Sequence, residues 1–279
     1  MICRTGLRLL PVMLLSALFF HAEAANQSAS RIHISFAMES AKLSLREPVV
    51  LIFTVQNQSE NSATVDLGQD RKENFLFSLM RPDGTSVRLP QLRSDGFSIL
   101  GVVSIEPGKH YVQQIVLNEW SEFEQLGSYK IRASLAKPVR VGRASEGELV
   151  VEADFQILPK QPEKLLKVCD ALLRRVYSAP SYEATAEAAL ALSYVRDPIA
   201  IPHLRKMLVS GLVEGFALKG LQRIGNREAV QVLIAAYGEG PGQRKSELQQ
   251  RAGGALSTIA RETRDPELRK DIMRALHQK

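Results

Sequence analysis

The stretch Ala188–Leu204, which reads AALALSYVRDPIAIPHL, decides the fold because a second version of it follows in the chain. A shift of 29 positions aligns small residues with small ones, aliphatic with aliphatic, and one helix-capping residue with another. Self-similarity at about this period is typical of stacked helical repeats. The matching residues of the second copy are Ala217, Gly220, Leu221, Ile224, Asn226, Ala229, Val230 and Leu233.

Each copy predicts two helices joined by a short turn. The apolar residues fall three and four positions apart, as a helix with one buried face requires. Asp197 is a good N-cap and Pro198 suits the first helical position, so one helix ends near Val195 and the next begins at Pro198. In the second copy Gly225 suits a left-handed helix end, and Asn226 takes the cap. A looser third copy contains Ala252, Leu256, Ile259 and a cap at Asp265.

This pattern resembles the HEAT family, especially its short bacterial form with the unit Ala-Ala-x-Ala-Leu-x-x-Ile-Gly-Asp-Pro-x-Ala-Val-Pro-x-Leu. The resemblance is strongest over Ala188–Leu208 and extends from about Pro162 to the C-terminus. It implies a HEAT-like α-solenoid over residues 160–279 that binds other molecules. It implies no chemistry, because such repeats serve many unrelated proteins. Two positions depart from the pattern, since Arg196 and Arg227 stand where Gly and Pro are usual.

The preceding residues, 31–158, change to a period of two. Polar residues alternate with Ile32, Ile34 and Phe36, and turn sequences surround Gly84 and Gly108. Several short strands with turns at this spacing indicate an antiparallel β-sandwich. The clearest strand candidates are Val49–Asn57, Phe75–Met80, Tyr111–Leu117, Tyr129–Leu135 and Val150–Ile157.

One motif refines the prediction for the sandwich. The segment Leu126–Ile131 resembles the tyrosine corner of immunoglobulin-like sandwiches, in which a Tyr at the start of a strand bonds back to an upstream loop. Because no Cys pair and no Trp on a middle strand accompany this motif, the domain resembles bacterial macroglobulin or proteinase-inhibitor modules and not antibody domains. We expect Trp120 and Phe123 to cover one end of the sandwich. The chain is thus predicted to be a multi-domain β + α protein, with an Ig-like sandwich at 25–159 and the solenoid at 160–279.

Residues 1–24 are predicted to be a signal peptide. Two arginines precede the short apolar run Leu9–Phe20, and Ala22-Glu23-Ala24 is a small-residue cleavage signature. We therefore expect a periplasmic or secreted bacterial protein that begins at Ala25, with an uncleaved N-terminal anchor as the alternative. No later segment is apolar for long enough to span a membrane. The exported chain would keep only Cys169, which helical spacing places on a buried face.

The sequence lacks the common catalytic motifs. It contains no H-E-x-x-H zinc site, no G-x-S-x-G nucleophile elbow and no phosphate-binding glycine-rich loop. We therefore expect no catalytic residue, no metal and no cofactor, and we predict that the protein is not an enzyme.

Charge distribution indicates where a partner would bind. Residues 25–159 contain 14 Lys or Arg and 16 Asp or Glu, whereas residues 160–279 contain 20 and 13. A positive solenoid attracts an anionic protein or envelope component, although its charge could equally serve solubility. Nucleic acid is not an expected partner of an exported protein. In HEAT-like stacks the second helix of each pair lines the concave face, which implies binding by Arg205, Lys206, Lys270 and Arg274.

Two hypotheses for function follow. The favoured one is a non-enzymatic exported interaction protein, or scaffold, that docks such an anionic partner. The alternative is an enzyme accessory such as a proteinase inhibitor, or a HEAT-type lyase. No nucleophile with a neighbouring base supports a lyase, and no thioester-type Cys-Gly-Glu-Gln supports the inhibitor.

Overall fold

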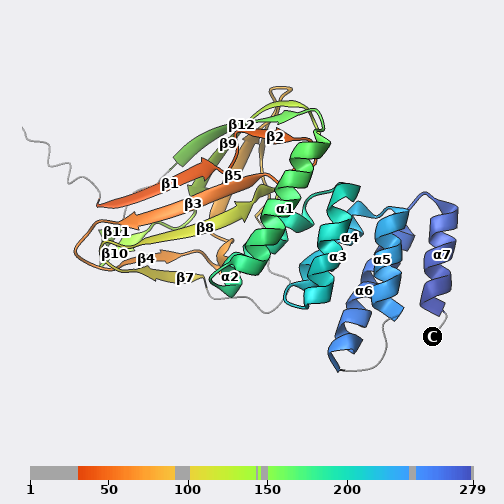
Figure 1. Cartoon of the computed structure of the whole chain (residues 1–279). Coiled ribbons are helices and arrows are strands. Elements are labelled where there is room, and N and C mark those ends of the chain that lie inside the picture. Colours follow the sequence, from red (N-terminus) through yellow and green to blue (C-terminus); the bar gives the residue numbers. More distant parts are fainter. Residues whose placement is uncertain (1–30, 92–100, 143, 146–149, 239–242, 278–279) are drawn as a thin grey trace, which may run out of the picture. The chain divides into compact units, whose positions relative to one another are not determined.

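The computed structural model describes residues 31–91, 101–142, 144–145, 150–238 and 243–277. An N-terminal β region, rich in antiparallel pairs, precedes a C-terminal helical region (Figure 1). Arg31–Lys279 form one compact unit. The predicted signal peptide and the expected start at Ala25 lie outside the described residues, so both stay predictions.

The described strands form three sheets. The first has the order β1–β3–β8 and is antiparallel, with Phe36 opposite Phe53. The second has the order β11–β10–β4–β7. The third has the order β2–β12–β9–β5–β6, in which only the β2–β12 pair is parallel. The strands are β1 (Ile32–Met38), β2 (Lys42–Ser44), β3 (Val50–Asn57), β4 (Ala63–Asp66), β5 (Phe75–Met80), β6 (Ser86–Arg88), β7 (Val102–Ile105), β8 (His110–Val116), β9 (Gly127–Leu135), β10 (Arg140–Val141), β11 (Ala144–Ser145) and β12 (Val150–Leu158). Two short 3₁₀ helices, η1 (Gln69–Arg71) and η2 (Leu117–Glu119), lie between them.

The alternating pattern places each predicted strand correctly. Ile32, Ile34 and Phe36 are buried on one face of β1, as a period of two requires. The five other strand candidates correspond to β3, β5, β8, β9 and β12, with ends that shift by two residues at most. Gly84 adopts φ 81° and its N–H donates to the Arg81 carbonyl at 2.9 Å, so the tight turn between β5 and β6 is confirmed.

Aromatic side chains fill the core of the β region. The rings of Phe36 and Phe75 each lie within about 6 Å of Phe53. Trp120 and Phe123 are each only 6% exposed, so both belong to this core, as expected from their position before β9. The Tyr129 hydroxyl donates to the Gln125 carbonyl at 2.9 Å, which is the backward bond that a tyrosine corner predicts.

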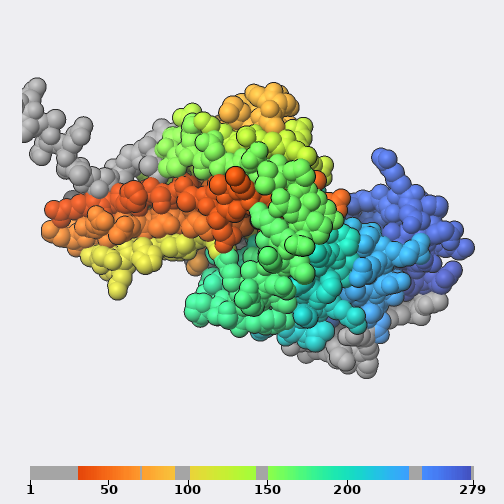
Figure 2. All heavy atoms as spheres, turned by 45° about the horizontal axis from the view of Figure 1, so that its top comes forward, coloured from red at the N-terminus to blue at the C-terminus, as the bar shows by residue number. Residues whose placement is uncertain are grey.

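The helical region consists of paired helices. The repeat groups them as α2 with α3, α4 with α5, and α6 with α7, after α1. The partners α4 and α5 contact each other, as do α6 and α7, whereas α2 packs chiefly on α1 and α4. Helices α2, α4 and α6 pack in one layer, while α5 contacts both α3 and α7 in a second layer. The helices follow one another in chain order, from green α1 to blue α7 (Figure 2). Their bounds are α1 (Pro162–Ser178), α2 (Tyr182–Ser193), η3 (Pro198–Ala200), α3 (Ile201–Ser210), α4 (Glu214–Ile224), α5 (Arg227–Gly238), α6 (Gln243–Glu262) and α7 (Pro266–His277).

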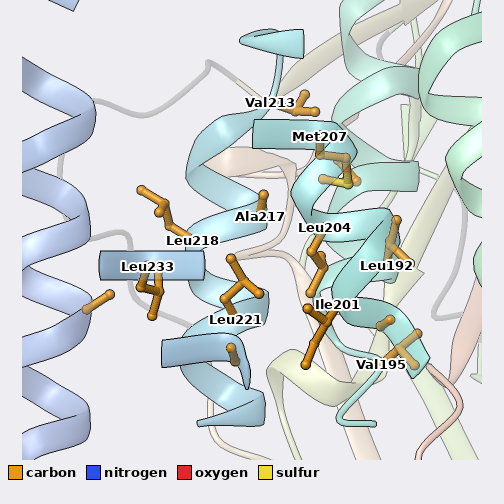
Figure 3. Close-up of a cluster of buried hydrophobic side chains, with 14 of the residues drawn as sticks. Leu192, Val195, Ile201, Leu204, Met207, Val213, Ala217, Leu218, Leu221 and Leu233 are labelled. Atoms are coloured by element: carbon orange, nitrogen blue, oxygen red, sulfur yellow. The ribbon is translucent and has the colours of Figure 1, made fainter. Parts of the chain in front are cut away.

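The repeated residues form the core of this region. Leu192 and its counterpart Leu221 are fully buried, in one continuous cluster with Leu204 (Figure 3). Gly220 takes the position of a small residue because its helix approaches the preceding pair closely. A Cβ added there would lie 2.9 Å from Leu204 Cδ2 and 3.1 Å from Ser193 Cα. The small-residue positions of the repeat therefore allow the helices to stack.

The helix ends follow the predicted capping chemistry. Asp197 Oδ1 accepts from the N–H of Ile199 at 3.2 Å, and Asn226 Oδ1 accepts from the N–H of Ala229 at 2.9 Å. Gly225 ends α4 with φ 59°. The helix predicted to begin at Pro198 differs, because its first turn is the 3₁₀ helix η3. Pro202 has no N–H to donate to the carbonyl four residues earlier, so the α-helical ladder starts later.

Asp197 also joins the two regions. Its side chain is 4% exposed and lies 2.6 Å from Lys160 Nζ and 3.4 Å from Arg46 Nη1. Two strand residues, Val50 and Val116, belong to the same buried cluster as the helices. The predicted domain boundary between residues 159 and 160 stays a prediction, and ion pairs such as Arg46–Asp197 and Glu47–Lys164 cross it.

We expect Asp197→Ala to destabilise the protein by about 1–2 kcal/mol, chiefly through the lost cap. Burial alone would raise the pKa of this carboxyl, but the bonds from Lys160 and the Ile199 N–H hold it below its usual range. The stabilisation should therefore be present above about pH 4, the ordinary pKa, and be lost as the pH falls through the lower folded value. Urea unfolding at pH 7 and pH 3 measures both effects. Equal stability of the variant and wild type at pH 7 would contradict this role.

Candidate interaction groove

A groove of about 1020 Å³ lies between α3 and α5 on the second layer of helices. The end of α1 and one residue of α6, Leu248, close its sides. The groove is mainly apolar with charged residues on its rim. The residues that line it include Tyr177, Ile201, Arg205, Lys206, Leu208, Val209, Glu228, Val232, Ala235 and Ala236.

Helix α5 presents two short side chains to the groove, beside the longer Glu228, Gln231 and Val232. Ala235 and Ala236 leave space opposite α3, where longer residues would fill the gap. Ile201 is 2% exposed and forms part of the floor, whereas Val209 is 84% exposed at the edge. Tyr177, which also lines the groove, is 51% exposed, and several exposed apolar side chains around one groove indicate an interaction surface better than a single one does.

The α3 edge of the groove is basic. Arg205 and Lys206 are both exposed and line it. The Tyr177 hydroxyl donates to the Lys206 carbonyl at 3.1 Å, which ties the end of α1 to this edge. Glu228 lines the opposite edge on α5. The two edges of the groove therefore differ in charge.

The other two predicted residues lie elsewhere. Lys270 and Arg274 are exposed on α7 and are not among the residues that line the groove. Arg274 Nη1 lies 3.7 Å from Asp271 Oδ1, and Asp271 also pairs with Arg227 at 3.0 Å. The structure thus brings Arg205 and Lys206 together at the groove, and it places Lys270 and Arg274 on α7 beside an acidic residue.

Sequence reasoning missed the apolar part of this groove. Spacing predicts that Ala200, Ile201, Leu204 and Leu208 form the apolar stripe of this helix. Leu208 does pack against the helical core, but it is only partly buried and also lines the groove, whereas Met207 is fully buried. Val209 carried a signal, because it is an aliphatic residue outside the predicted stripe. Tyr177 carried none, since its place beside Lys206 depends on a contact between distant segments.

Two titratable side chains near α3, Cys169 and His203, are buried in the protein. Cys169 is fully buried, and burial raises the pKa of its thiol to about 12, which keeps it protonated. His203 is buried with Nε2 2.8 Å from Asp170 Oδ1, which links α3 to α1. Among the described residues, no three His, Cys, Asp or Glu side chains are grouped so that they could hold a metal ion. None of the described helices is both long and apolar enough to cross a membrane.

Comparison with known proteins supports the repeat. Residues 186–210, which span most of α2 with η3 and α3, match the family model of the PBS lyase HEAT-like repeat. The C-terminal region therefore contains HEAT-like repeats. No curated protein matches the sequence.

Solved structures show only partial likeness. A CARDB domain from Pyrococcus furiosus is 14% identical with a TM-score of 0.26, and the match covers 47% of this chain and 94% of that one. A β-glucosidase from Listeria innocua is 15% identical with a TM-score of 0.24, covering 46% of this chain and 16% of that one. TM-scores this low indicate neither a shared fold nor a shared function.

Proposed function

We propose that this chain is a non-enzymatic, exported interaction protein that docks an anionic protein through the α3–α5 groove. In this proposal an Ig-like sandwich carries a HEAT-like solenoid, and residues 1–24 direct export to the bacterial periplasm. The Tyr129–Gln125 bond supports the Ig-like assignment, and the stacked pairs α2–α7 support the solenoid. HEAT-like repeats generally mediate protein interactions, which agrees with a docking role.

The observation that carries the proposal is the basic edge beside an open apolar groove. Arg205 and Lys206 supply positive charge, and Val209 supplies exposed apolar surface next to them. Apolar contact contributes affinity, while opposite charge at the edge speeds association and selects the partner. An acidic protein segment with apolar side chains satisfies both parts of this surface.

The double variant Arg205→Glu/Lys206→Glu should slow association with the partner about tenfold or more at low salt. Crosslinking in the envelope fraction followed by mass spectrometry identifies the partner, and association rates are then measured between 0.1 and 1 M salt. Over that range the screening length falls from about 10 Å to about 3 Å, so wild-type association should slow steeply. The variant should lose most of this salt dependence.

The matched control is Lys270→Glu/Arg274→Glu, which reverses the same number of charges away from the groove. Its effect should be smaller, because Asp271 already compensates Arg274. A quadruple variant that combines all four substitutions should then associate with the partner about as slowly as Arg205→Glu/Lys206→Glu. Association unchanged in the quadruple variant would mean that the basic residues are only a solvated surface, and a larger effect of the α7 pair would move the site to α7.

A further inference from the structure

A second cavity, of about 540 Å³, lies where the β region meets the turns that end α2 and α4. This volume falls in the range of small-molecule sites. Its polar lining includes Asn118, Glu122, Glu124, Arg196, Arg223 and Asn226. None of these residues lines the α3–α5 groove, so this cavity is independent of the proposed docking function.

Arg223 is the central basic group of this cavity. Its Nη1 donates to the Ser193 carbonyl at 3.2 Å and to Ser193 Oγ at 2.9 Å, and its guanidinium carbon lies 3.7 Å from the centre of the Tyr194 ring. Burial lowers the pKa of Arg223, which is the direction expected for a desolvated cation. Within the described part of the chain no carboxylate is in ion-pair contact with it, and Glu119, whose charge acts on it, already pairs with Lys72 at 2.7 Å. A largely buried cation whose acidic neighbour is paired with another residue favours an anionic ligand.

Arg196 adds a second guanidinium that the repeat does not require. The 29-residue shift aligns Arg196 with Gly225, so the second copy carries no side chain at this position. Arg196 pairs with Glu122, and its Nη1 lies 3.6 Å from Glu124. The Glu122 and Glu124 side chains are 59% and 74% exposed. A ligand can therefore displace these partly solvated ion pairs at small cost.

The remaining charges of the cavity are already compensated within the protein. Arg46 pairs with the buried Asp197, and Glu47 lies 3.0 Å from Lys164 Nζ. This leaves two guanidinium groups and two carboxylates that face the cavity and have no buried ion-pair partner of opposite charge. A lone anion would be repelled by the two carboxylates, whereas a ligand with one charge of each sign matches both.

We propose that this cavity binds a small zwitterion, a free amino acid or a short peptide. Arg196 and Arg223 hold the carboxylate, and Glu122 and Glu124 accept hydrogen bonds from the ammonium group. Guanidinium groups suit this task because their planar donors match a carboxylate in paired hydrogen bonds. The apolar lining from Leu45, Phe123 and Ile224 favours an aliphatic side chain on the ligand.

Isothermal titration calorimetry on the full chain tests the charge requirement. The probes are L-leucine and L-alanyl-L-leucine, with N-acetyl-L-leucine and L-leucinamide as analogues that each lack one charge. At least one zwitterion should bind, and both analogues should bind about tenfold or more weakly, the loss expected for a missing charge-assisted hydrogen bond. If neither zwitterion binds, the proposal fails. If N-acetyl-L-leucine binds as tightly as L-leucine, the site takes a simple anion and the zwitterion is wrong.

Three variants test which residues of the cavity bind the ligand. Arg196→Gly, which installs the residue of the second copy, and Arg223→Met should each weaken binding about tenfold or more. Glu122→Gln should reduce the preference for L-leucine over N-acetyl-L-leucine. The control Arg174→Met removes an exposed arginine on α1 outside the cavity and should leave binding unchanged. Circular dichroism shows whether Arg223→Met is folded. Wild-type binding by Arg196→Gly would overturn the assignment even if Arg223→Met does not fold.

Discussion

Leu192→Ala and Leu221→Ala should each lower the stability of the protein by about 2–5 kcal/mol. Both side chains are fully buried at the same position of successive repeats, within one core cluster. Truncation loses the transfer free energy of the removed methyl groups and leaves a cavity that rigid helices close only in part. For a chain of this size each kcal/mol corresponds to roughly 2–4 °C in Tm, so each variant should melt at least about 4 °C lower.

The matched control is Leu212→Ala, which removes the same atoms from a side chain that is 59% exposed. Its Tm should stay close to that of the wild type, because an exposed leucine gains little from folding. Thermal unfolding followed by helical circular dichroism measures all three variants. A Tm within error of wild type for both buried leucines would show that the repeat register is wrong.

The repeat register could be predicted because it depends on local spacing. Small residues at Ala188 and Ala217 and leucines four positions later recur at fixed intervals, and helix geometry converts that recurrence into a buried stripe. The same holds for caps, since Asp197 and Asn226 bond to N–H groups two or three residues away. Chemistry that acts within one turn of a helix is visible in the sequence.

Several short strands could not be predicted, because a prediction from periodicity needs a longer run of residues. β4 and β7 are each four residues long, and β10 and β11 are each two, so none of them contains enough alternation to reveal a period. The parallel pairing of β2 with β12 joins residues more than a hundred positions apart. Such pairing depends on the completed fold, and local pattern does not encode it.

The candidate sites, too, could be predicted only in part from local sequence pattern. Arg205 and Lys206 could be assigned to the solvent face of a helix from spacing alone, whereas the groove beside them also needs Tyr177 and the alanines of α5. The cavity at Arg223 combines residues from four segments of the chain, one of which contains Asn118 and Glu122. Helix periodicity indicates which way a residue faces, and only the packing of distant segments shows what it faces.

The stability of the protein should also depend on pH through Glu187, a residue of α2 that is mostly buried and faces the β region. Helix α2 contacts β8, and the strand residue Gln114 offers its backbone N–H to the carboxyl. Burial raises the pKa of Glu187 to about 7. That N–H and the positive charges of Arg175, Arg71 and Lys72 act in the opposite direction, and burial outweighs them.

The sign of the effect follows from the raised pKa. The folded protein holds the Glu187 proton more tightly than the unfolded chain, in which the carboxyl has the ordinary glutamate pKa of 4.5. The stabilisation from this proton is therefore fully present below about pH 4.5 and is lost as the pH rises to about 7. This difference between the folded and unfolded pKa of Glu187 corresponds to a change of roughly 3 kcal/mol at most in the free energy of unfolding between low and high pH. Above pH 7 this contribution should stay constant.

Glu187→Gln should remove this dependence, because the amide has nearly the same shape and stays neutral at every pH. Relative to wild type, the variant should gain up to about 3 kcal/mol in the free energy of unfolding between pH 4.5 and pH 8. Urea unfolding of both proteins across that range measures the difference, which cancels the contributions of other titrating groups. The matched control is Glu183→Gln, an exposed carboxyl one turn earlier on α2, and it should retain the wild-type slope. If the stabilities of wild type and Glu187→Gln change in parallel from pH 4.5 to pH 8, Glu187 does not titrate in this range and its contact with β8 tolerates the charge.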